Sequence, residues 1–165
     1  MKRPQTNYAF IDGTNLYLTM KNLGWKLDMQ KFRIYLRDKY GIVKAYYFVG
    51  YLPEYANLYT SLQSFGYVIV FKPTLRIKGK VKGNCDAELV LQAMIDLPNY
   101  ERAVIVTSDG DMACLVKYLR SQDKLLRVLA PCLEGSSHLL RLAAQTDIAF
   151  MDNLKQKLEY KGKTP

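Results

Sequence analysis

Short apolar runs alternate with amphipathic helical patterns along almost the whole chain, and this alternation limits the possible folds more than any other feature. Strands that alternate with helices form a parallel sheet with helices on both faces. We therefore predict an α/β fold. The expected strands are Tyr8–Ile11, Val43–Val49, Tyr67–Phe71, Ala103–Thr107, Leu125–Ala130 and, more weakly patterned, Ile148–Met151. The expected helices are Asn15–Leu23, Met29–Tyr40, Glu54–Phe65, Asp86–Leu97, Asp111–Arg120 and Ser137–Ala144.

The chain has 165 residues, which suits one compact domain, and we place that domain at residues 1–152. Residues 74–83 break the strand–helix rhythm, because apolar and basic residues alternate there about Gly79. This pattern predicts a mobile β-hairpin arm whose basic residues share one side, facing solvent or a ligand. Residues 153–165 form a polar, basic tail, and we expect it to fray from Lys155 onward.

The net charge is +9, from 24 basic and 15 acidic residues. Surplus Lys and Arg residues commonly neutralise phosphates, which favours a nucleic acid partner over a role in solubility alone. The expected hairpin carries much of this charge and no acid. We therefore expect it to contact RNA phosphates through Arg76, Lys78, Lys80 and Lys82.

Other features indicate a cytoplasmic protein. No apolar run approaches the roughly 18 residues of a membrane span, so we expect no membrane contact. The first residues do not resemble a signal peptide. The cysteines Cys85, Cys114 and Cys132 lack the spacing of a metal site, and we expect reduced, structural thiols.

Two of the expected strands end in small polar turns that carry aspartates. The first strand leads into Asp12, and the fourth leads into Asp109 and Asp111. In parallel α/β sheets, ligands bind at the carboxyl ends of strands. A further acid, Asp86, opens a helix in which its i+4 and i+7 neighbours are apolar, so this carboxylate should face the sheet. Glu88 lies on a more polar face of that helix and is a weaker candidate.

Several carboxylates that converge without a cation repel one another, and a hard divalent ion is the simplest way to neutralise them. Mg²⁺ or Mn²⁺ held in this way activates water and polarises a phosphoryl oxygen. Taken singly, Asp86 and Asp111 also have a structural explanation, because acids stabilise the first turn of a helix. This chemistry needs no histidine, and we expect His138, which is the only one, to be structural.

The acidic motifs, in this order, resemble the NYN domain, which belongs to the PIN-like superfamily of metal-dependent ribonucleases. The resemblance covers roughly residues 7 to 152. It implies a Rossmann-like PIN fold, a central parallel sheet with helices on both faces, and an acidic site at the carboxyl ends of the strands. The motifs that carry it are Asp12-Gly13-x-Asn15, Gly83-x-x-Asp86, Ser108-Asp109-Gly110-Asp111 and Ser136-Ser137-x-Leu139, running on to Asp147 and Phe150.

The resemblance also implies roles for individual residues and a cofactor, Mg²⁺ or Mn²⁺. Asn15 and Ser108 would support the site. Two positions depart from the family pattern: Cys85 replaces a small aliphatic residue, and Gln145-Thr146-Asp147 replaces an Ala-Asp run, which leaves a role for Asp147 open. The catalytic, metal-binding residues would be Asp12, Asp86, Asp109 and Asp111.

We therefore expect a metal-dependent (endo)ribonuclease that acts on single-stranded or loop RNA. The alternative is a non-catalytic RNA-binding or regulatory module on the same fold. Asp12-Gly13-Thr14 also resembles the nucleophile motif of haloacid-dehalogenase phosphatases, but Phe10 stands where their attacking aspartate is needed. No GxGxxG motif follows the first strand, which argues against a dinucleotide-binding Rossmann protein.

Tyrosines crowd the region between residues 46 and 59. We expect most of them to be buried. For the others, stacking on bases and a homodimer interface both stay open. The residues are Tyr46, Tyr47, Tyr51, Tyr55 and Tyr59.

Overall fold

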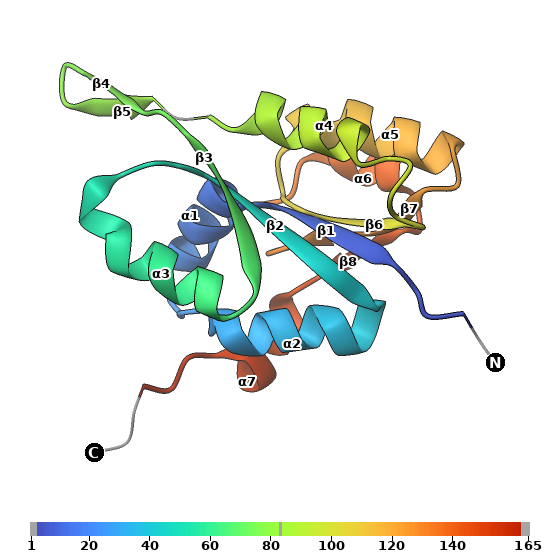
Figure 1. Ribbon diagram of the computed structural model, residues 1–165, viewed down its shortest axis with the longest axis horizontal. Coiled ribbons are helices and arrows are strands. Elements are labelled where there is room, and N and C mark those ends of the chain that lie inside the picture. The colour runs from blue at the N-terminus through green and yellow to red at the C-terminus, as the bar shows by residue number, and fades with distance from the viewer. Residues whose placement is uncertain (1–2, 83, 163–165) are drawn as a thin grey trace.

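The computed structural model describes residues 3–82 and 84–162 (Figure 1). In this part of the chain, six parallel strands form one sheet in the order β3-β2-β1-β6-β7-β8, which confirms the predicted α/β fold. The sheet strands are β1 (Asn7–Asp12), β2 (Ile42–Gly50), β3 (Tyr67–Lys72), β6 (Ala103–Val106), β7 (Leu125–Ala130) and β8 (Ile148–Phe150). The α-helices are α1 (Gly13–Leu23), α2 (Met29–Tyr40), α3 (Ala56–Ser64), α4 (Asp86–Ile95), α5 (Ala113–Ser121), α6 (His138–Ala144) and α7 (Lys155–Leu158).

Two of the expected helices begin with a separate 3₁₀ turn. The turn η1 (Pro53–Tyr55) precedes α3, and η2 (Gly110–Met112) precedes α5; a third, η3 (Asp152–Leu154), precedes α7. Proline suits the start of η1 because its backbone nitrogen has no hydrogen to leave unsatisfied. None of the helices in residues 3–82 and 84–162 has the length and apolar character needed to cross a membrane.

Helices cover both faces of the sheet, and each face has its own apolar core. Alternate residues of β1 serve the two cores, as the period of a strand requires. Ala9 and Ile11 pack with residues of α1 and α2, whereas Phe10 packs with residues of α4, α5 and α6. Figure 1 shows α4 and α5 above the sheet and α2 below it. Burial on both faces explains why the central strands β1 and β6 are almost entirely apolar.

The order of the strands reverses between β1 and β6. From β1 the chain runs outward through β2 to β3, then crosses back by way of α4 to β6, on the other side of β1. A parallel sheet opens a crevice at such a switch point, outside the carboxyl ends of the two strands. Those ends carry Asp12 and Thr107-Ser108-Asp109. The topology therefore brings two of the acidic turns side by side.

Between β3 and α4 the chain forms an antiparallel hairpin of β4 (Leu75–Ile77) and β5 (Lys80–Lys82), which projects from the body of the molecule (Figure 1). Lys78 and Gly79 form its turn with positive φ angles of 51° and 75°. Two positive φ angles characterise the type I′ turn, whose twist matches that of paired strands.

The register of this hairpin corrects one expectation. Directly opposed residues of an antiparallel pair project to the same face. Ile77 lies opposite Lys80, and Arg76 lies opposite Val81. Lys80 therefore shares a face with Ile77, while Arg76 projects to the other face, so the prediction of a single basic side is wrong. The side chain of Lys82 and the whole of Gly83 lie outside the described residues.

The first part of the C-terminal tail is docked, which corrects the expectation that it frays from Lys155. Leu158, in α7, is only 1% exposed and belongs to the same apolar core as the buried residues of α2. Its carbonyl accepts a hydrogen bond of 2.8 Å from the Asp28 backbone N–H. Tyr160 donates its backbone N–H to the Lys26 carbonyl, also at 2.8 Å. One buried leucine, together with these backbone bonds, holds residues 155–160 in place.

Candidate metal centre and adjoining cavity

Three aspartates come together at the switch point of the sheet. Asp12 ends β1, Asp109 follows β6, and Asp86 is the first residue of α4. Each offers a carboxylate oxygen, and these oxygens all lie within 4.8 Å of one another. Oxygens at this spacing can share one ion, since Mg²⁺ and Ca²⁺ bind oxygen at about 2.0–2.6 Å. The structure thus brings together three of the four acids that were predicted to bind metal.

Asp111, the fourth acid, lies at the side of this cluster. Its carboxylate is not among the three that gather within 4.8 Å. Its side chain is exposed, and its backbone N–H donates a hydrogen bond of 2.9 Å to Asp109 Oδ1. It lies close enough to Asp86 to contribute to the raised pKa of that carboxyl. Asp111 therefore fixes Asp109 through its backbone and adds negative charge beside Asp86.

Thr107 connects two of the three aspartates. Its hydroxyl donates to Asp12 Oδ2 at 3.2 Å and accepts from the Asp109 backbone N–H at 3.1 Å. The other carboxylate oxygen of Asp12 accepts from the Asn15 backbone N–H at 3.1 Å, which also caps α1. Thr107 was not predicted from the sequence, although a threonine that ends a buried β-branched strand just before an acidic turn was a visible signal.

The two predicted supporting residues contact each other. Asn15 Oδ1 accepts hydrogen bonds of 2.9 Å from both the backbone N–H and the hydroxyl of Ser108. This pair ties the start of α1 to the turn after β6. The turn that carries Asp109 is therefore held by side chains from both sides of the crevice.

The start of α4 is held by Asn84, a second residue that was not predicted from the sequence. Asn84 Oδ1 accepts from the Asp86 backbone N–H at 2.8 Å, and its carbonyl accepts from Lys72 Nζ at 2.5 Å. Lys72 also lies 3.6 Å from one oxygen of Glu88. The other Glu88 oxygen is buried and has no hydrogen-bond partner among the described residues. Cys85, between Asn84 and Asp86, is buried.

Both Asp-Gly pairs place glycine where two elements touch. A Cβ at Gly13 would lie 2.5 Å from the Tyr47 ring and 2.7 Å from the Phe48 carbonyl oxygen. A Cβ at Gly110 would collide with the Ser137 hydroxyl. Real Cβ atoms do not approach neighbours so closely, so a larger residue would push either turn away from its support. Close packing explains the glycine after each aspartate.

Burial and repulsion from neighbouring acids raise the pKa values of two of these carboxyls, Asp12 and Asp86. The pKa of Asp12 is raised to about 6, chiefly by burial; the charges of Asp86 and Asp109 contribute to this rise, and hydrogen bonds from Asn15 and Thr107 offset part of it. Burial also raises the pKa of Asp86. Among the described residues, no Lys or Arg forms an ion pair with any of the three aspartates. An all-oxygen group of carboxylates with no basic partner fits a hard divalent cation.

A cavity of about 760 Å³ opens beside the aspartates. Its volume falls within the range of small-ligand sites, roughly 300–1,000 Å³. Asp12, Asp86 and Asp109 line one end. The remainder is largely aromatic and aliphatic, with Tyr17 and Leu18 from α1, Leu52 and Tyr55 before α3, and Leu58 and Tyr59 from α3.

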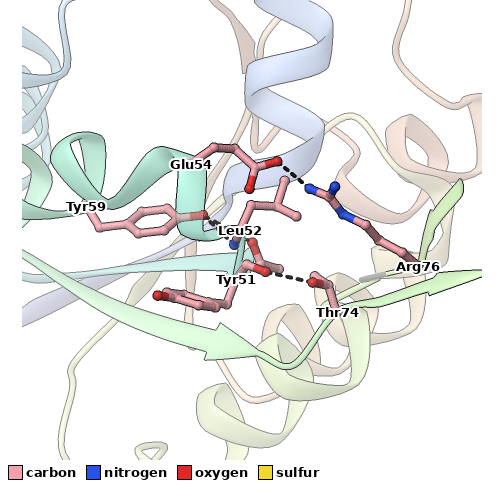
Figure 2. Close-up of polar contacts among 7 residues, drawn as sticks. Tyr51, Leu52, Glu54, Tyr59, Thr74 and Arg76 are labelled. Carbon is pink, nitrogen blue, oxygen red and sulfur yellow. Dashed lines mark hydrogen bonds and ion pairs between the residues drawn. The ribbon is translucent and has the colours of Figure 1, made fainter. Parts of the chain in front are cut away.

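The root of the hairpin is attached to the wall of this cavity, as Figure 2 shows. Thr74 donates its hydroxyl to the Tyr51 carbonyl at 2.7 Å, and Arg76 forms an ion pair with Glu54. Thr74 itself lines the cavity. Arg76, one of the predicted RNA contacts, thus has an acidic partner, whereas Lys78 and Lys80 are exposed and form no ion pair with the described residues.

The crowded tyrosines divide as expected, with Tyr46, Tyr47 and Tyr59 buried and Tyr51 and Tyr55 exposed. Two other residues lie outside the site. Asp147 precedes β8, at the amino edge of the sheet, and pairs with Arg120 at 3.3 Å. His138 is exposed at the start of α6 and is not among the described residues that line the cavity.

Comparison with known proteins agrees with this architecture. The model of the NYN domain family matches residues 8–152. The chain is 24% identical over 139 residues to the "Low amplitude and bright protein LabA" of Synechococcus elongatus, an alignment that covers 78% of this chain and 75% of that protein. The crystal structure of a protein of unknown function from Vibrio parahaemolyticus has the same fold, with a TM-score of 0.78 and 20% identity, over 97% of this chain and 99% of that chain.

Proposed function

The chain belongs to the NYN domain family, and from this premise we propose that it is a divalent-metal-dependent ribonuclease that hydrolyses RNA phosphodiester bonds. NYN domains lie within the PIN-like nuclease superfamily. The observation that carries the proposal is the cluster of Asp12, Asp86 and Asp109, whose oxygens converge without a basic partner among the described residues. We propose cytoplasmic RNA as the substrate.

In this proposal the three aspartates hold Mg²⁺ or Mn²⁺, and Asp111 supplies further negative charge from the side. A bound ion of this kind activates water and stabilises charge on the phosphoryl oxygens. Thr107 orients the Asp12 carboxylate through its hydroxyl. Asn15 and Ser108 keep the Asp109 turn in place through their two hydrogen bonds. Preorganised carboxylates lower the cost of assembling the site when substrate binds.

The hairpin supplies a second part of the proposal. Lys78 and Lys80 are exposed on it, and with Lys82 they would contact phosphates of a single-stranded or loop RNA. Arg76 would do so only by leaving Glu54 or by sharing its charge with it. Contacts to phosphate position a strand without reading its sequence, so we expect them to act similarly on different RNAs.

Cleavage of a mixed RNA pool tests the proposal. We expect pure protein to cut the pool with Mn²⁺ or Mg²⁺ and to be inactive with chelator. Asp109→Asn keeps the size of the side chain and removes its charge, so it should lower the rate by at least about 100-fold. Asp123→Asn is the matched control, because Asp123 lies on the surface in a weak ion pair with Arg102 at 3.7 Å. Equal cleavage by the wild type and Asp109→Asn would reveal a contaminating nuclease or a different site.

A non-catalytic RNA-binding module on the same fold is the second candidate. The basic hairpin and the net charge of +9 favour it, since neither depends on cleavage. The name of the LabA relative also states no reaction. RNA binding that persists in chelator, with no cleavage in either metal, would support this candidate over the first.

A further inference from the structure

Beside the aspartates, the cavity is lined by large apolar side chains that are exposed to solvent. Tyr17, Leu18, Tyr55 and Leu58 are each between 39% and 52% exposed, although all four line one hollow. Scattered exposed apolar side chains are ordinary, but a concave group of them marks a place where a ligand binds. Two are phenol rings close enough for Tyr17 to raise the pKa of Tyr55, so the rings are neighbours.

The floor of the hollow is rigid. Tyr47 is 5% exposed and its hydroxyl donates to the Gly13 carbonyl at 3.3 Å. The Tyr59 hydroxyl accepts from the Leu52 backbone N–H at 3.1 Å, a bond visible in Figure 2, and donates to the Gly50 carbonyl at 3.4 Å. Side chains fixed in this way keep the cavity open without a ligand, and a preformed pocket binds at lower entropic cost.

The charges around the hollow restrict what can occupy it. None of the described residues that line it is Lys, Arg or His, and one end carries three aspartates. A phosphate group therefore has no cationic side chain to pair with there, and only a metal ion at the aspartates would supply positive charge. A flat, neutral, aromatic group suits the tyrosines and leucines, and polar side chains at Thr14, Thr74 and Asn84 can meet its edge.

We propose that this cavity binds one unpaired nucleobase of the RNA strand, the base of a nucleotide adjacent to the phosphate held at the aspartates. The inference rests on the proposed ribonuclease function. Base-paired nucleotides keep their bases stacked inside the helix, so a base must leave its stack to enter. The cavity therefore makes the site selective for single-stranded or unpaired RNA. Tyr17 and Tyr55 stack on the base, an interaction that tolerates different bases.

Binding measured in chelator, where no cleavage takes place, tests the stacking on the base directly. The probe is a fluorescein-labelled eight-nucleotide RNA, read by anisotropy. Tyr17→Ala should weaken binding by about fivefold or more, which is the effect of removing one ring that stacks on a base. Tyr118→Ala is its matched control, because Tyr118 is similarly exposed, on α5, and does not line the cavity. Equal affinity of wild type and Tyr17→Ala would overturn the proposal.

A second test fills the cavity instead of emptying it, with one variant inside the hollow and a control outside it. Leu58→Trp adds a ring system inside the hollow and should weaken the same probe to a similar degree. Leu91→Trp is the control, since Leu91 is exposed on α4, outside the cavity. Circular dichroism verifies that both variants fold. Unchanged binding by a folded Leu58→Trp variant would count against the cavity as the base site.

Altered probes identify the source of the base. A series of probes, each lacking the base at one position, is compared with the complete RNA. For at least one position, we expect the wild type to bind the abasic probe as weakly as Tyr17→Ala binds the complete RNA. Annealing the probe to its complement should remove the difference between wild type and Tyr17→Ala. If AMP or UMP alone binds as tightly as the eight-nucleotide RNA, the cavity serves free nucleotides and the proposal of a strand-borne base is wrong.

The two proposals fail in different ways. Absence of cleavage in Mg²⁺ and Mn²⁺, together with base-dependent binding in chelator, would overturn the ribonuclease function and leave the base site. Metal-dependent cleavage with affinity that is insensitive to base removal would overturn the base site alone.

Discussion

The two ends of helix α4 differ in how the protein surrounds a carboxylate. After its last turn, Asp96 is 8% exposed and accepts hydrogen bonds from the Tyr46 hydroxyl, the Gln92 amide at 3.1 Å and the Asn99 amide at 3.3 Å. Burial alone would raise the pKa of Asp96, but these donors outweigh it, so the pKa lies below its usual value. At the first turn, Asp86 faces Asp12, which is 6% exposed and has a pKa raised to about 6.

Burial alone therefore does not decide the state of a carboxylate in this protein. Asp96 and Asp12 are almost equally inaccessible to solvent, yet their pKa values move in opposite directions, because Asp12 lies deeper in the protein and because the two carboxylates differ in their donors and acidic neighbours. Asp96 has a complete set of donors and no acidic neighbour in contact. Asp12 has two donors and two acidic neighbours. A buried acid that lacks sufficient donors stores unfavourable energy that a cation relieves.

The largest effect on stability should come from removing Asp96, whose carboxylate accepts three hydrogen bonds. Asp96→Ala leaves the buried Tyr46 hydroxyl without its acceptor and removes the bonds from Gln92 and Asn99. We expect the free energy of unfolding to fall by about 4 kcal/mol, because hydrogen bonds to charged groups contribute most. Urea titration measures this change. Asp38→Ala, at an exposed aspartate on α2, is the control and should change stability little. If Asp96→Ala is as stable as the control, the contrast between the two ends of α4 is wrong.

Removing the carboxylate of Asp12, beside the first turn of α4, should have a smaller effect on stability, and of opposite sign. The pKa of Asp12 is about 6 in the folded state and 3.8 in the unfolded chain, so the folded state binds the proton more tightly. The free energy of unfolding in chelator therefore falls as pH rises from about 4 to about 6. Asp12→Asn removes this loss, so at pH 8 the variant should be more stable than wild type by up to about 3 kcal/mol.

Urea titrations in chelator at pH 4 and pH 8 measure the effect of Asp12→Asn. The advantage of the variant should be present at pH 8 and largely absent at pH 4, where wild-type Asp12 is protonated in the folded state. A variant that is less stable than wild type at pH 8 would show that the Asp12 carboxylate is structural.

The smallest effect concerns paired and unpaired positive charge on the hairpin. Replacing Lys78 and Lys80 by alanine should reduce the slope of log affinity against log salt by about 0.7 for each phosphate that is no longer neutralised. Arg76→Ala should change the slope less, because Glu54 already pairs with that charge. Lys117→Ala, on α5, is the control. Fluorescence anisotropy at several salt concentrations gives the slopes, and an unchanged slope in the double lysine variant would exclude the hairpin as an RNA guide.

The fold could be predicted because its signals are local. A run such as Val104-Ile105-Val106 is buried on both faces, so its own composition identifies a central strand. The acidic turns at Asp12 and Asp109 could likewise be assigned to one site, because parallel strands end at a common edge. These predictions need no knowledge of which side chains touch.

The remainder depends on partners that are distant in the chain. Thr107 reaches Asp12 across 95 positions; its place just before an acidic turn is visible in the sequence, but the partner of its hydroxyl is not. The face to which Arg76 projects follows from the register of the hairpin, which a single residue in the turn can reverse. Leu158 stands between Lys157 and Glu159 in a polar tail, so its docking against the core that includes residues of α2 was hidden by the composition around it.

Gly13 limits how the two parts of the site can change during evolution. Its hydrogen atom is all that fits between the end of β1 and the ring of Tyr47, and its carbonyl accepts the Tyr47 hydroxyl bond. Asp12 precedes this contact directly, and Tyr47 lines the cavity. A larger residue at position 13 would move the acid and the cavity floor together. Positions 12, 13 and 47 are therefore coupled, so a substitution at Gly13 that reshapes this part of the cavity floor also displaces the acid beside it.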